Sequence, residues 1–198
     1  MALHARILEG RIVRLEPLTL DHLPGLAGVA FDPDLWRWTV NRVETDGDLR
    51  RYVDEALAAQ RSGSALPFCT IHKPTSTVVG STRFGNYDAA NHRVEIGWTW
   101  VAGPWQRSTV NAEAKLLMLR HAFDEIGCLR VEFKTDRLNV RSQGALEKLG
   151  AVREGVLRSH MLVKGGRRRD SVYYSILAEE WPAVRSRLEE RVSAGADS

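Results

Sequence analysis

The sequence has few of the side chains that metal and redox sites need. Its two cysteines, Cys69 and Cys128, lie far apart and form no CxxC pair, which argues against a zinc knuckle or a dithiol redox motif. Its six histidines are scattered, and no two have the i, i+4 spacing of a helical metal site. We therefore expect no metal, and the cysteine content is typical of a reducing compartment.

Long apolar runs and strong charge are also missing. No stretch approaches the roughly 20 apolar residues that a membrane-spanning helix needs, and residues 1–6 lack the apolar core of a signal peptide. The formal net charge of +3 at pH 7 is too small to indicate nucleic acid as a partner, but it suits an anionic ligand. We expect a cytoplasmic protein that binds neither membranes nor nucleic acid.

What the sequence does have is the length and composition of one globular domain. The chain is 43% apolar and 27% charged, which is ordinary for a folded domain, and 198 residues can bury a core without disulfides. No repeat, low-complexity block or linker interrupts it. We therefore expect a single domain over residues 1–198, with its core at about 11–192 and a flexible tail at 193–198.

Apolar periodicity predicts an α/β domain with a mixed sheet. One strand–helix–strand segment spans about forty residues, and such a crossover makes its two strands parallel. Two other strand pairs are joined by short turns, so they are expected to be hairpins. The expected strands are 11–17, 66–72, 78–84, 93–101, 129–135, 151–162 and 171–177, and the expected helices are 19–27, 45–62, 111–126, 139–149 and 179–192.

The turn at 103–111, with the sequence GPWQRSTVN, lies between the strand and the helix of that crossover. The first N–H groups of a helix have no partner inside it, and the helix dipole adds partial positive charge there. A Gly/Pro-opened turn aims several such groups at one point, which is a common way of binding phosphate. We expect this turn to hold the pyrophosphate of a nucleotide-like cofactor. A compatible alternative is that Ser108 only caps the helix.

Four motifs, in this order, resemble the GNAT acetyltransferase superfamily, and within it the RimJ/RimL-like ribosomal-protein N-terminal acetyltransferases. They are VEIGW at 94–98, WQRSTVNAEAK at 105–115, NVRS at 139–142 followed by EKLG at 147–150, and RD at 169–170 before Tyr173. The resemblance covers almost the whole chain. It implies a single-domain GNAT fold, in which helices flank a mixed, mostly antiparallel sheet with a splayed parallel strand pair.

The resemblance also implies the ligands. The co-substrate would be acetyl-CoA, the acceptor would be a primary amine on a protein N-terminus or a small molecule, and a homodimer is compatible with the family. The pantetheine arm would pair with the splayed strand, where Gly97 permits a bulge. The alternatives are ordinary sheet pairing and, for the helix start at 139, a simple N-cap. The implied cofactor-binding residues are Trp98, Trp100, Val101, Gln106, Arg107, Ser108, Thr109, Val110, Asn111, Asn139 and Ser142.

The sequence departs from the family pattern within the turn. The pattern Gln/Arg-x-x-Gly-x-Gly/Ala begins at Gln106, but Thr109 stands where its first glycine is expected and Asn111 where its small residue is expected. Threonine does not readily adopt positive φ. We therefore expect the backbone at Thr109 to have an ordinary negative φ.

Glu95 and Ser142 are the expected catalytic residues. A carboxylate at Glu95 can deprotonate the incoming ammonium directly or through water, or it can be a strand glutamate paired with Arg93 or Arg83. The resemblance places Ser142 near the thioester sulfur, where its hydroxyl can protonate the leaving thiolate, although a serine in a short helix needs no function. Either Tyr173 or Tyr174 can serve as the acid instead, and core packing is the alternative for both.

The implied reaction is direct attack of a neutral amine on the thioester. An α-amine has a pKa of about 8, against about 10.4 for lysine, so α-amines are easier to deprotonate near neutrality. One alternative is a non-catalytic acyl-CoA-binding or regulatory module. Another is a different donor such as succinyl-CoA, whose acyl chain a basic residue such as Arg83 or Arg93 would suit. The basic run 167–169 could bind nucleic acid, but a solvated hairpin tip is the simpler interpretation.

Overall fold

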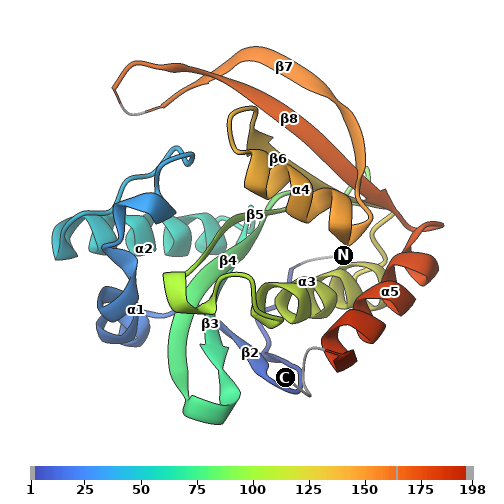
Figure 1. The fold of residues 1–198 in the computed structure, drawn as a ribbon, viewed down its shortest axis with the longest axis horizontal. Helices are drawn as coiled ribbons and strands as arrows, with labels where there is room; N and C mark the ends of the chain where they lie inside the picture. The colour runs from blue at the N-terminus through green and yellow to red at the C-terminus, as the bar shows by residue number, and fades with distance from the viewer. Residues whose placement is uncertain (1–2, 164, 195–198) are drawn as a thin grey trace.

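The computed structural model describes residues 3–163 and 165–194 and contains one eight-stranded sheet (Figure 1). The strand order is β1-β2-β3-β4-β5-β6-β8-β7. Every neighbouring pair is antiparallel except β5 and β6, which are parallel. The strands are β1 (Leu8–Glu9), β2 (Val13–Pro17), β3 (Leu66–His72), β4 (Thr77–Asp88), β5 (Arg93–Val101), β6 (Arg130–Asp136), β7 (Val152–Leu162) and β8 (Arg168–Leu177).

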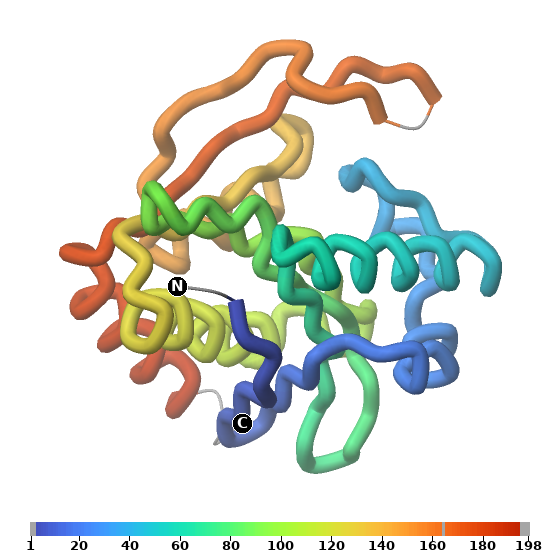
Figure 2. Tube along the Cα trace, turned by 180° about the vertical axis from the view of Figure 1, so that it is seen from behind, coloured from blue at the N-terminus to red at the C-terminus, as the bar shows by residue number. Residues whose placement is uncertain are grey.

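Helices cover both faces of the sheet (Figures 1 and 2). One apolar cluster joins the sheet to the last three helices, and a second cluster joins the opposite face to the first two. None of the helices in the described residues has the length and hydropathy of a membrane-spanning segment. The helices are α1 (Leu23–Ala30), α2 (Asp46–Arg61), α3 (Val110–Arg120), α4 (Val140–Leu149) and α5 (Trp181–Ala194).

The parallel pair β5–β6 separates partway along its length. The two strands pair only where Arg93–Glu95 lies opposite Arg130–Glu132. Beyond Glu95, the described part of β5 pairs with β4 alone. The expected mixed, mostly antiparallel sheet with a splayed parallel pair is therefore confirmed. We call the paired residues 93–95 and 130–132 the closed end, and the unpaired stretch of β5 at 96–101 the open end.

A bulge in β5 turns its side chains over at the open end. Side chains four residues apart share a face in a regular strand. Yet Ile96 packs in the apolar cluster that contains α3, α4 and α5, and Trp100 packs in the cluster that contains α1 and α2. The register against β4 also shifts by one residue, between the pairs Arg83↔Gly97 and Ser81↔Trp100. The residue that adopts positive φ is Trp98, at 50°. The bulge expected at Gly97 therefore lies one residue later.

Other boundaries differ from the periodicity for local reasons. The strand expected at 78–84 is longer, since β4 continues to Asp88, with Asn86 at a φ of 50°, although the glycine and asparagine at 85 and 86 favour turns. The helix expected at 111–126 ends as an α-helix at Arg120 and continues as a π-helical segment, His121–Glu125. Of the expected tail, 193–194 belong to α5, and 195–198 lie outside the described residues.

A buried carboxylate fixes the start of α3 against the N-terminal strands. Glu113 accepts hydrogen bonds from the backbone N–H groups of Arg11, Ile12 and Val13, at 2.8, 2.9 and 2.6 Å. Hydrogen bonds to a charged acceptor are stronger than those between neutral groups. Glu113 therefore holds the first turns of α3 in place, and with them the loop that precedes the helix.

Candidate active site

The open end of β5 is a backbone edge that no described strand covers. The bulge residue Trp98 is held from the α2 side, where the Tyr52 hydroxyl donates to the Trp98 carbonyl at 3.4 Å. At the far end, the Gln106 side-chain amide donates to the Val101 carbonyl at 2.8 Å. A strand edge that no other strand pairs with can bind an extended ligand that carries amides, as a further strand would.

The turn before α3 presents backbone donors beside this edge. The N–H groups of Arg107, Ser108 and Thr109 donate to no residue in the described part of the chain. The left-handed position is Arg107, with a φ of 65°, whereas Thr109 has a φ of −74°. The expected negative φ of Thr109 is thus confirmed. Free N–H groups at a helix start suit a phosphate.

Ser108 acts as a local cap within that turn. Its hydroxyl donates to the Trp105 carbonyl at 2.7 Å and accepts from the Val110 N–H at 3.2 Å. The capping interpretation therefore holds for the side chain, and phosphate binding by Ser108 rests on its backbone N–H. Asn111, at the start of α3, has a buried Oδ1 without a partner among the described residues.

The start of α4 lies close to the same turn. Arg141 donates from Nη1 to Gln106 Oε1 at 2.6 Å, which joins α4 to the turn. Asn139 is an N-cap, because its Oδ1 accepts from the Ser142 N–H at 3.0 Å, and its amide Nδ2 remains available. The Ser142 hydroxyl makes no hydrogen bond within the described residues. The structure thus brings Gln106, Asn139 and Ser142 to one region.

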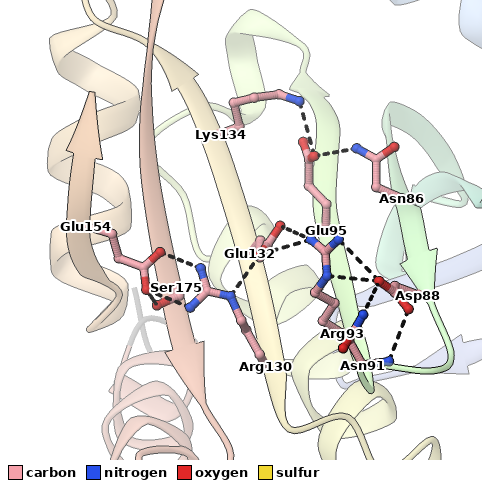
Figure 3. A network of polar contacts seen from close by, with 10 residues as sticks. All are labelled: Asn86, Asp88, Asn91, Arg93, Glu95, Arg130, Glu132, Lys134, Glu154 and Ser175. Carbon is pink, nitrogen blue, oxygen red and sulfur yellow. Dashed lines mark hydrogen bonds and ion pairs between the residues drawn. The ribbon is translucent and has the colours of Figure 1, made fainter. Parts of the chain in front are cut away.

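Glu95 lies at the last paired position of β5 and is buried, with 5% of its surface exposed. It accepts hydrogen bonds from Asn86 Nδ2 at 2.7 Å and from Lys134 Nζ at 3.2 Å (Figure 3). The structural alternative, a pairing with Arg93 or Arg83, is wrong, because Lys134 on the neighbouring strand is the cation that reaches this carboxylate. Glu95 is therefore a positioned carboxylate at the point where the splay begins.

Charged pairs cross the sheet at the closed end (Figure 3). Arg93 contacts Asp88 and Glu132, each at 3.3 Å, and Arg130 donates from Nε to Glu132 at 2.8 Å. Arg130 also pairs with Glu154, and this hydrogen bond lowers the pKa of the Glu154 carboxyl. The network links β4, β5, β6 and β7, so it holds the strands together directly before they separate.

The two candidate tyrosines lie on opposite faces. Tyr174 is fully buried, and its hydroxyl donates to Glu147 on α4 at 3.0 Å, so it is a packing residue. Tyr173 pairs with Lys134 across β6 and β8 and lies beneath its ammonium, which is 5.9 Å from the ring centre. Burial, and then the nearby Glu95, raise the pKa of Tyr173. Tyr173 is the tyrosine that shares the face of Glu95.

The basic run 167–169 is not simply a solvated hairpin tip. Arg167 pairs with the buried Asp136 at 2.5 Å, and Arg169 is itself buried. Burial is the main cause that lowers the pKa of Arg169, although Asp136 opposes it. Because only Arg168 is exposed, the run faces inward toward the sheet more than the sequence indicated.

A buried lysine on α3 contacts the open end of β5. Lys115 on α3 donates from Nζ to Thr99 Oγ1 at 2.8 Å, and no carboxylate in the described residues pairs with it. Burial lowers its pKa to about 7. In the sequence, Lys115 directly precedes the apolar run LLML at 116–119, and in the structure residues 110–119 of α3 are almost all buried. A charged side chain in such a helix requires explanation.

A cleft opens between the segment before α2 and the β7–β8 hairpin. Its volume is about 380 Å³. Residues of the segments 31–45 and 163–169 line it. No group of three or more potential metal ligands occurs among the residues that the structure describes. The lining residues are Pro33, Asp34, Trp36, Arg37, Thr39, Asn41, Arg42, Val163 and Arg167.

Comparison with known proteins identifies the family. A family model described as an acetyltransferase (GNAT) domain matches residues 13–152. YdaF of Bacillus subtilis (strain 168), a candidate ribosomal N-acetyltransferase, is 30% identical over 105 residues, which are 53% of this chain and 56% of YdaF.

Two solved structures share the fold. A GCN5-related N-acetyltransferase from Brucella melitensis is 30% identical, with a TM-score of 0.91 over 98% of this chain and 91% of that one. Mycobacterium smegmatis RimJ in complex with CoA-disulfide is 24% identical, with a TM-score of 0.79 over 94% and 92%. The resemblance to the GNAT superfamily is confirmed, and the chain belongs to the GNAT acetyltransferase family, whose members transfer acyl groups from acyl-CoA.

Proposed function

We propose that this protein transfers an acetyl group from acetyl-CoA to a primary amine by direct attack of the amine on the thioester. The observation that carries the proposal is the open end of β5, which lies between free turn amides on one side and Glu95 on the other. An arm with two amides and a pyrophosphate matches that sequence of groups. The CoA-disulfide bound to RimJ supports the same cofactor class.

The residues fit the cofactor in three places. The N–H groups of residues 107–111 would hold the pyrophosphate, and that of Val110 would give up its hydrogen bond to Ser108 Oγ to do so. The backbone of Trp98, Trp100 and Val101 would pair with the pantetheine. The amide Nδ2 of Asn139 would donate to the arm from α4. Gln106 now bonds to Val101, so its side chain would move when the arm takes up that carbonyl. When bound, acetyl-CoA supplies the activated thioester.

Two side chains would carry the proton transfers. Glu95, held by Asn86 and Lys134, would accept the ammonium proton of the acceptor directly or through water. Ser142 has a hydroxyl without an internal partner, so it would be free to donate a proton to the departing thiolate. Tyr173, on the face of Glu95, is the second candidate for that acid.

The acceptor would be the amine of a protein N-terminus or of a small molecule. The name of YdaF points to a ribosomal protein, and the cleft beside Arg167 has room for a short peptide end or a small amine. A non-catalytic acyl-CoA-binding or regulatory module is the competing proposal, because the same backbone groups would bind coenzyme A without turnover.

The test combines calorimetric titration with a thiol-release assay on a panel of peptides and amines. The proposal predicts that coenzyme A binds and that at least one amine releases its thiol from acetyl-CoA. Binding without release from any amine would favour the non-catalytic module. Absence of both would contradict the assignment of the open end to the cofactor.

A further inference from the structure

Arg83 is a buried guanidinium that the described residues leave without a polar partner. It lies on β4, opposite Gly97 of β5, and only 7% of its surface is exposed. Its Nε is fully buried without a hydrogen bond, and no ion pair or hydrogen bond joins its other nitrogens to the described residues. A buried charge of this kind is costly unless an opposite charge accompanies it.

Two aromatic rings hold the guanidinium in place. Its central carbon lies 4.9 Å from the ring centre of Trp98 and 5.7 Å from that of Tyr52. Such contacts stabilise the charge through the faces of the group. The five N–H donors lie in the plane of the guanidinium, so the rings do not satisfy them. The rings fix the group, and its donor edge remains available for a ligand.

Other arginines near this part of the sheet have carboxylates beside them that Arg83 lacks, and even the buried Arg169 lies 4.0 Å from Asp136. Arg93, Arg130 and Arg167 each pair with a carboxylate within the chain. The carboxylate nearest in register is Glu95, which pairs with Gly85 two residues beyond Arg83. Glu95 is instead bonded to Lys134 and Asn86. No carboxylate among the described residues therefore neutralises the charge of Arg83, and a bound ligand could supply one.

We propose that Arg83 binds a carboxylate that one of the two substrates carries into the open end. This inference rests on the proposed function, since it places the carboxylate beside Trp98, where the arm would end. A fixed guanidinium binds a carboxylate through two parallel hydrogen bonds. The carboxylate can belong to the acyl group, as in succinyl-CoA, or to the acceptor, as in an amino acid or an acidic N-terminal residue.

Binding of coenzyme A and of two acyl donors separates the first source of the carboxylate from the second. Calorimetry compares coenzyme A, acetyl-CoA and succinyl-CoA on the wild type, Arg83→Met and Arg93→Gln. The control removes a guanidinium of the same face whose charge Asp88 and Glu132 already neutralise. If the acyl group carries the carboxylate, succinyl-CoA binds the wild type and the control about 10- to 100-fold tighter than acetyl-CoA, and Arg83→Met loses this preference.

The acceptor arm uses acetyl-CoA as the donor. Amines with a neighbouring carboxylate are compared with their carboxamide analogues by kcat/KM. If the acceptor carries the carboxylate, the acids are preferred by about 10- to 100-fold in the wild type and the control but not in Arg83→Met. A wild type without either preference, or a preference that survives in Arg83→Met, would overturn the proposal.

A third measurement separates this proposal from the proposed function. Sodium succinate and sodium chloride are compared at equal ionic strength by thermal unfolding. Succinate should raise the Tm of the wild type and leave Arg83→Met unchanged, even if no coenzyme A binds. Equal effects on both proteins would overturn the carboxylate site. Arg83→Met itself should unfold at the same or a higher temperature, because it removes a buried charge.

Discussion

The closed and open ends of the β5–β6 pair differ in whether their polar groups have partners within the chain. At the closed end, Arg93, Glu132 and Arg130 form a chain of ion pairs across adjacent strands. At the open end, the guanidinium of Arg83 and the N–H groups of residues 107–109 have no acceptor in the described residues. Buried or clustered polar groups are usually satisfied. The difference indicates that the closed end is built for stability and the open end for a ligand.

The same contrast appears in the two carboxylates nearest the junction. Glu132, at the closed end, is bound to two arginines. Glu95, in register with it, is bound to one lysine and one amide and lies at the first step of the splay. Matched substitutions at the two ends therefore test whether the ends differ in function.

The largest effect is expected for Glu95→Gln. The amide keeps the size of the side chain but cannot accept a proton, so kcat/KM for thiol release should fall about 10²- to 10⁴-fold. Coenzyme A should bind with unchanged affinity in calorimetry. Glu132→Gln is the matched control, and an equal loss of activity in both variants would show that Glu95 has no special role.

Thr109→Pro should weaken coenzyme A binding by about 10- to 100-fold. Proline removes the N–H of residue 109, which makes no internal hydrogen bond, and the φ of −74° is one that proline adopts. Thr109→Ala, which keeps the N–H, should bind nearly as well as the wild type. Unchanged affinity in a Thr109→Pro protein with a normal Tm would remove this amide from the cofactor site.

Lys115→Met should change how stability depends on pH. Burial depresses the lysine pKa from 10.5 to about 7, so the unfolded chain binds more protons than the folded chain between these values. The free energy of unfolding of the wild type should then rise with pH across that window, by about 1 kcal/mol per pH unit. Below about pH 7 the lysine is protonated in both states, so it should cause no further change with pH. Urea unfolding from about pH 6 to about pH 9 should show the rise in the wild type and its loss in Lys115→Met.

The smallest effect is expected for Glu132→Gln on stability. The carboxylate is partly buried between Arg93 and Arg130, and loss of its charge should lower the free energy of unfolding by about 1 kcal/mol. High salt should reduce the difference from the wild type. A variant as stable as the wild type at low salt would show that the network does not hold the closed end.

Much of this fold could be read from local pattern. The strands and helices follow from periodicity, and the parallel pair follows from one strand–helix–strand crossover. The phosphate-binding turn was expected from its place at a helix start. The splay and the pantetheine-binding residues came from the family resemblance, because neither periodicity nor spacing distinguishes an unpaired strand edge from a paired one. The bulge shows that limit, since Gly97 is the residue that favours positive φ and Trp98 is the residue that adopts it.

The partners of the charged residues were harder to foresee. Glu95 was expected to face Arg93 or Arg83, but its cation comes from β6, which only the parallel register brings beside it. The burial of Arg83 depends on Tyr52, which lies on a helix distant in sequence, and on the ring of Trp98, the bulge residue. Such contacts arise from tertiary packing, which local sequence does not encode.

Hydrogen–deuterium exchange with and without coenzyme A reports on the backbone of both ends at once. If the open end binds the cofactor and the closed end is structural, exchange should slow in segments 96–101 and 107–111 when coenzyme A is bound, with no change in residues 93–95 and 130–132. Slowing confined to other segments, or equal slowing at both ends of the β5–β6 pair, would contradict that assignment.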